Sequence, residues 1–80
     1  MCFTCPDTAV LQFALYLEQL ESAYYDQGLT LFNESAFGAV GFPPKVRQRF
    51  VEMLGHELTH VALIEGLLGS DAPQPCNYSL

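Results

Sequence analysis

Basic residues are scarce in this chain of 80 residues: Lys and Arg together number three, against nine Asp and Glu, and the formal net charge is −6. All three basic residues lie in one short run, at Lys45, Arg47 and Arg49. A surface that binds nucleic acid needs a much larger basic patch, so the composition argues against nucleic acid as a partner. We expect this run to be solvated and to pair with Asp26 or Glu34 across the turn of a helical hairpin.

Long apolar runs are also absent. Gln12, Glu18 and Glu21 interrupt the first apolar segment, so no stretch is long enough to cross a bilayer. No basic-then-apolar leader precedes a cleavage site, and we expect no signal peptide in these residues. Half of the residues are nevertheless hydrophobic, which excludes a disordered chain. One small domain is expected, and a domain of this size commonly needs a disulfide, a metal or a partner subunit.

The spacing of the apolar residues predicts two long helices and no strand. The expected elements are a helix at about 8–32, a connector at 33–43, a second helix at about 44–69 and an extended strap at 70–80. Asp7 or Thr8 is suited to cap the first helix. Pro44 is suited to the first turn of the second, and Gly69 to its end. Two long helices with a short connector form an antiparallel hairpin, so the predicted fold class is all-α.

Cysteines are few and odd in number: Cys2 and Cys5 precede the first helix, and Cys76 follows the second. A single C-x-x-C pair indicates metal or redox chemistry only weakly. An antiparallel hairpin brings both regions to the same end, which makes a disulfide from Cys2 or Cys5 to Cys76 plausible. The third thiol is then free or joins two subunits. A disulfide would favour a secreted or oxidising compartment, and nothing else in the sequence indicates the location.

The sequence HELTH, residues 56–60, contains two overlapping metal-site motifs. As H-E-x-x-H it matches a zinc metallopeptidase, and as E-x-x-H it matches half of a carboxylate di-metal site in a four-helix bundle. At about 100° per residue, Glu57 lies at the centre of the apolar face and His60 about 60° to one side, whereas His56 lies about 100° away. The peptidase hypothesis is the weaker one, because it needs both histidines in one open cleft and a third ligand downstream.

The first helix carries a similar acidic residue. Glu21 lies within about 20° of the centre of its apolar face, and Glu18 lies on the flank. An ionised carboxylate that is buried without a partner costs several kcal/mol, and no Lys or Arg is near mid-helix. Bound cations would explain why Glu21, Glu57 and His60 converge. A metal-free core in which these groups hydrogen-bond to one another is the open alternative.

Several segments together resemble a known family. The resemblance rests on VLQFALYLEQLESAYYDQGL, a connector ending in GFP, VRQRFVEMLGHELTHVALIEGLLG and the tail PCNYSL. They are similar to the ferritin-like domain family of fungal and bacterial stress- or desiccation-related proteins, in which the complete domain is a four-helix bundle. This chain matches the first two helices. The resemblance implies metal ligands at Glu57 and His60 and one from the first helix, either Glu21 or Glu18.

One hairpin provides only half of such a site, because the other half comes from two further helices. We therefore expect a homodimer that completes a four-helix bundle. Iron or manganese is expected in preference to zinc, because carboxylates outnumber histidines. Such a centre could oxidise iron or activate oxygen or peroxide, and no organic substrate is indicated. We expect His56 and Tyr25 beside the ligands and not among them.

Overall fold

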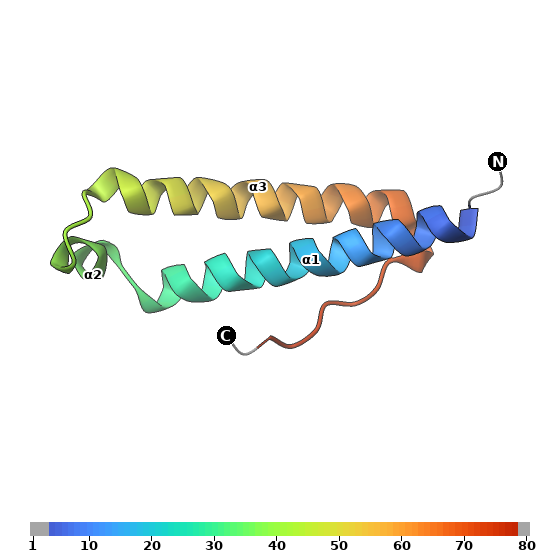
Figure 1. Ribbon diagram of the computed structural model, residues 1–80, viewed down its shortest axis with the longest axis horizontal. Helices are drawn as coiled ribbons and strands as arrows, with labels where there is room; N and C mark the ends of the chain where they lie inside the picture. Colours follow the sequence, from blue (N-terminus) through green and yellow to red (C-terminus); the bar gives the residue numbers. More distant parts are fainter. Residues whose placement is uncertain (1–3, 79–80) are drawn as a thin grey trace.

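The computed structural model describes residues 4–78 as a helical hairpin. Its elements are α1 (Thr4–Leu31), α2 (Glu34–Ala39), α3 (Pro44–Leu68) and a short 3-10 turn η1 (Gly69–Asp71). Helices α1 and α3 lie side by side and antiparallel, α2 lies in the connector, and the chain after η1 runs back along α1 (Figure 1). The described residues contain no strand. The predicted all-α hairpin is confirmed.

The helix ends differ from the prediction mainly at the start. Helix α1 begins at Thr4, earlier than the expected start at about residue 8, and Asp7 lies in its first turn instead of capping it. Pro6 is compatible with this early start, because the first helical turn needs no backbone N–H donors and proline already has a helical φ. Gly69 ends α3 with a φ of 56°, a left-handed conformation that glycine adopts without strain.

The hairpin is a single layer of helices. Its radius of gyration is 15.8 Å, whereas a compact domain of this length would have about 12 Å. Its shortest dimension is 15 Å, little more than one helix. Leu15 and Leu68 are the buried apolar side chains among the described residues. No helix in this part of the chain is both long and apolar enough to span a membrane. The two helices alone therefore enclose very little core.

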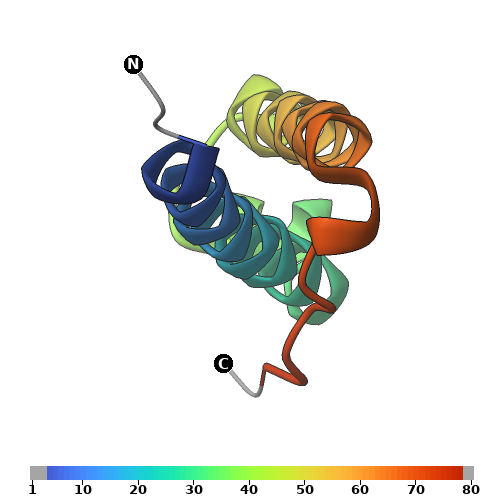
Figure 2. The same cartoon turned by 90° about the vertical axis from the view of Figure 1, so that its right-hand side faces the viewer.

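The segment after η1, residues 72–78, is an extended strap, as the sequence predicted. Three glutamine side chains of α1 donate hydrogen bonds to backbone carbonyls, one of them in η1 and two in the strap. They run from Gln12 to Asp71 (2.9 Å), from Gln19 to Pro73 (3.3 Å) and from Gln27 to Tyr78 (2.9 Å). The end view shows the strap on one side of α1 (Figure 2). The glutamines thus fix the path of a segment that has no regular structure of its own.

An arginine of α3 caps the end of α1. Helix α1 has no basic residue in its last turn, but Arg47 donates from Nη2 to Leu29 O at 2.8 Å and from Nε to Phe32 O at 2.9 Å. Carbonyl groups at a helix C-terminus lack partners within the helix, and a guanidinium also opposes the negative end of the helix dipole. Arg49 pairs with Glu52 on its own helix at 2.8 Å. Both arginines thus differ from the expected pairing with Asp26 or Glu34.

Replacing Arg47 by Met should lower the free energy of unfolding by about 1–3 kcal/mol, because two hydrogen bonds from a charged donor are lost. Arg49→Met is the matched control. The Arg49 and Glu52 side chains are 74% and 54% exposed, so this change should cost less than about 1 kcal/mol. Urea denaturation of both variants tests the difference, and equal costs would show that the cap does not stabilise the hairpin.

Candidate metal centre

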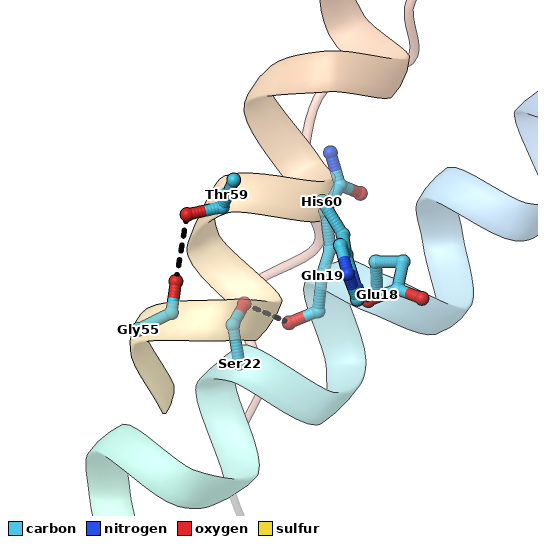
Figure 3. Close-up of polar contacts among 6 residues, drawn as sticks. All are labelled: Glu18, Gln19, Ser22, Gly55, Thr59 and His60. Carbon is cyan, nitrogen blue, oxygen red and sulfur yellow. Dashed lines mark hydrogen bonds and ion pairs between the residues drawn. The ribbon is translucent and has the colours of Figure 1, made fainter. Parts of the chain in front are cut away.

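Two glutamates and a histidine meet midway along the hairpin. Glu18 of α1 and Glu57 and His60 of α3 each offer one ligand atom, and these atoms lie within 4.8 Å of one another. Glu57 and His60 are three residues apart and therefore share one side of α3. Glu18 and His60 point toward one another from the two helices (Figure 3). Among the side chains that the structure describes, this is the one group of His, Cys, Asp and Glu that could hold a metal ion.

The three side chains differ in exposure. The Glu18 side chain is 23% exposed and the His60 side chain 53%, with 3.4 Å between Glu18 Oε2 and His60 Nδ1. Glu18 Oε2 and Glu57 Oε2 are shielded from solvent and have no hydrogen-bond partner. A buried polar atom without a partner loses its hydration without compensation. The centre therefore presents two shielded carboxylate oxygens without a hydrogen bond, and Glu18 Oε2 lies beside the His60 imidazole, which is positively charged only when protonated.

A third carboxylate lies beside them. The pKa of Glu21 is raised above its ordinary value, first by a hydrogen bond with Glu57 and then by desolvation. The pKa of Glu57 is raised as well, first by hydrogen bonding with Glu18 and then by desolvation. These hydrogen bonds need a proton on one carboxyl group of each pair, because two ionised carboxylates can only accept. Without that proton, the carboxylates repel one another and favour a cation.

The structure brings together most of the predicted site. Glu57 and His60 lie in the group as expected, but the group contains Glu18, whereas the helical wheel favoured Glu21. The apolar face on which the wheel was centred included Leu17 and Tyr24, which are 43% and 61% exposed, and left out the buried Leu15. Centring on the buried Leu15 would have moved the expected position toward Glu18.

The other candidates lie outside the group. His56 does not belong to the group, whereas Glu57 and His60 do, so the geometry favours E-x-x-H over the zinc-peptidase motif. Tyr25 packs against Tyr24 and Phe50, with ring centroids 5.5 and 6.1 Å apart, and is an aromatic packing residue. Cys76 is an exposed free thiol in the strap. Cys2 and the side chain of Cys5 lie outside the described residues, so the disulfide stays a prediction.

The centre borders an apolar surface that nothing in the hairpin covers. On α1 and α3 this surface, called the open face here, has exposed side chains that recur every seven residues and therefore share one side of each helix. They are Val10 (65% exposed), Leu17 (43%), Tyr24 (61%) and Leu31 (69%) on α1, and Met53 (39%) and Leu67 (65%) on α3. His60 lies midway between Met53 and Leu67 in the same series. The imidazole therefore lies on the open face.

The donor set suits a divalent cation. Glu18 and Glu57 supply carboxylate oxygens and His60 an imidazole nitrogen, a mixture that iron and manganese accept. The shielded and unpartnered oxygens are the feature that a bound ion would satisfy. The residues present therefore fit a metal, and these three would hold it.

Antiparallel helices that direct glutamates and an E-x-x-H histidine into their interface are typical of carboxylate metal proteins built on helical bundles. Comparison with known sequences gives the family: the model of the ferritin-like domain matches residues 6–80, and the chain belongs to this family. Protein rds1 of Schizosaccharomyces pombe is 33% identical over 72 residues. That match covers 90% of this chain but only 18% of rds1. No solved structure matches the chain.

The raised pKa values predict how the stability of the metal-free protein depends on pH. Glu21 and Glu57 bind protons more tightly in the folded than in the unfolded protein, because their pKa values are raised. Their protonation therefore stabilises the folded state fully below the ordinary pKa of 4.5, and this stabilisation is lost as the pH rises through the raised pKa values. The other titratable side chains that lie beside Glu57 are those of Glu18 and His60. In chelator, acidification from about pH 7 toward pH 5 should therefore raise the Tm through these two groups.

Glu57→Gln should flatten this pH dependence, because glutamine does not titrate. Glu65→Gln removes a carboxylate of the same helix outside the cluster, and it should leave the dependence as in the parent protein. Thermal melts across the pH range give the comparison. Parallel curves for the parent and Glu57→Gln proteins would show that the carboxylates do not share protons.

Proposed function

We propose that this chain is a ferritin-like metal-binding protein in which Glu18, Glu57 and His60 form one half of a di-metal site. The observation that supports this best is the pair of shielded oxygens, Glu18 Oε2 and Glu57 Oε2, which lack hydrogen-bond partners beside an imidazole. A cation between them would supply the missing partner for both. Glu21, hydrogen-bonded to Glu57, is the additional carboxylate next to the ligands.

A second copy of the hairpin completes the site in this proposal. Di-metal sites of helical bundles take a glutamate from each of two helices and an E-x-x-H pair from each of the other two. This hairpin has one of each, and a two-fold axis through the open face would add the other two. The 53% exposure of His60 and the exposure of Glu21 support this, because both lie where a facing copy would bring its own ligands.

Iron or manganese is the proposed metal. When bound, such a centre supplies redox chemistry, either the oxidation of ferrous iron or the activation of oxygen or peroxide. The residues of the chain bind the ion and exchange protons: a cation at Glu18 and Glu57 replaces the proton shared by the carboxyl groups. Metal affinity should therefore fall as the pH falls.

A metal-free polar core is the second candidate function, and the raised pKa values of Glu21 and Glu57 favour it. In that case the carboxyl groups remain partly protonated, hydrogen-bond to one another, and serve only to align the helices. Buried polar groups can specify packing in this way. The two candidates differ in what metal does to stability.

Bound metal should reverse the sign of the change in Tm that a single glutamine substitution causes. Saturating ferrous iron or manganese, at about 100 times its Kd, should stabilise the parent protein by about 2.7 kcal/mol, which is a rise in Tm of about 10 °C or more. Glu57→Gln should abolish this rise, and Glu18→Gln and His60→Ala should reduce it severely. In chelator the same glutamine variants should melt at or above the Tm of the parent, because a repelling charge is removed while the shape is kept.

Glu65→Gln, outside the cluster, should retain the full metal-induced rise. Thermal melts together with metal analysis of protein purified without chelator make the test. A parent protein that contains no iron or manganese and melts identically with and without them would eliminate the metal site, leaving the polar core.

The dimer makes a separate prediction. The chain should sediment as a dimer at micromolar concentration, and Leu17→Lys should shift it to a poorly helical monomer by placing a charge in the open face. Val40→Lys is the control, because Val40 is 72% exposed but lies in the connector, so its replacement should change neither mass nor helicity. Analytical ultracentrifugation with circular dichroism measures both. A parent protein that sediments as a folded monomer would contradict the dimer.

A further inference from the structure

A pocket of about 330 Å³ lies at the connector end of the hairpin, and none of the three candidate metal ligands lines it. Rings from α1, α2, α3 and the loop before α2 supply much of its wall. They belong to Tyr24, Tyr25, Phe32, Phe37 and Phe50. None of the residues that line it is charged. Pockets of this size and composition hold small molecules, and the lack of any charged group selects against ions.

The rings form a continuous wall that does not depend on a second chain. Tyr25 and Phe50 have centroids 6.1 Å apart, and Phe37 of α2 lies 5.9 Å from Phe50. Three helices of one hairpin therefore hold the wall in place. Such edge and tilted ring contacts stabilise aromatic clusters beyond simple burial. The aromatic wall is thus built within one hairpin, and the pocket meets the open face at Tyr24 and Leu31.

Glycine keeps the pocket open. Gly28 lines it from α1, and a Cβ atom placed there would meet no heavy atom within 4 Å. The backbone at Gly28 does not have a positive φ, so any L residue would fit it without strain. A glycine inside a helix costs about 1 kcal/mol relative to alanine. The helix therefore gives up stability at a position that lines the pocket and has room for a side chain.

The pocket lies close to the candidate metal centre. Tyr25 is four residues from Glu21, and Phe50 is seven residues from Glu57. At a rise of about 1.5 Å per residue, these separations are about 6 and 10 Å along the helix axes. A molecule in the pocket would therefore lie one to two helical turns from the carboxylates.

We propose that this pocket binds an uncharged, apolar small molecule of aromatic-ring size and holds it beside the metal centre. This deepens the proposed function, because it names the class of molecule that the centre would meet. Binding itself rests on the aromatic wall and needs no metal. Failure of the metal site and failure of the pocket can therefore be told apart.

The test uses N-phenyl-1-naphthylamine, a neutral apolar dye whose fluorescence rises in an apolar site, with the whole chain in chelator. Gly28→Leu fills the pocket and, because leucine favours helix, should preserve folding. Gly66→Leu is the matched control: Gly66 lies on α3, is exposed, and also has open space around its Cβ position. We expect Gly28→Leu to weaken dye binding at least about tenfold, equivalent to about 1.4 kcal/mol, and Gly66→Leu to leave it unchanged.

Three results would overturn the proposal. The first is a parent protein that does not bind the dye saturably, and the second is equal binding by both leucine variants. The third is a change in the sedimentation of Gly28→Leu, because the pocket would then receive the second hairpin and not a small molecule. Metal should stabilise Gly28→Leu as much as it stabilises the parent protein. If metal stabilises neither protein while the parent still binds the dye, the metal site fails and the pocket does not.

Discussion

Two helices in one layer can bury only the sides that face each other, and most features of this structure follow from that constraint. Leu15 and Leu68 are fully or nearly buried, but apolar side chains such as Val10 and Leu67 remain about two-thirds exposed. The hairpin therefore depends on interactions outside a hydrophobic core. Arg47 closes the end of α1, and glutamines of α1 hold the strap. Both sets of hydrogen bonds join segments through backbone carbonyls, and neither set requires a large hydrophobic core.

The same constraint places the acidic groups at a boundary. Glu18 Oε2 is shielded between the helices, while His60 reaches the open face. Carboxylates in such a position are too enclosed to be well hydrated and too close together to ionise freely. A cation and a shared proton are two ways to relieve this repulsion, and they compete for the same oxygens. The position of the group at the rim, and not in a closed interior, lets a facing surface contribute further ligands.

Periodicity was sufficient to predict the hairpin, the break at the connector and the E-x-x-H pair of Glu57 and His60, because these depend on local spacing. It favoured Glu21 over Glu18, which lies in the group, since a wheel cannot tell which apolar residues face α3 and which face outward. It also missed the role of Arg47, whose partners are backbone carbonyls 15 and 18 residues away and leave no pattern in the side chains. Contacts to backbone from distant residues are set by the fold, and they appear only with the structure.

The strap has a consequence for how copies of this hairpin can accumulate. Gln12 and Gln19 follow Val10 and Leu17 by two residues, which is about 200° around the helix, so the strap lies on the side of α1 opposite the open face. A hairpin with uncovered apolar surfaces on both sides could bind one neighbour on each side and so assemble into an open filament. In this hairpin the tail occupies the far side of α1, so the open face is the side of α1 that is left for a second copy.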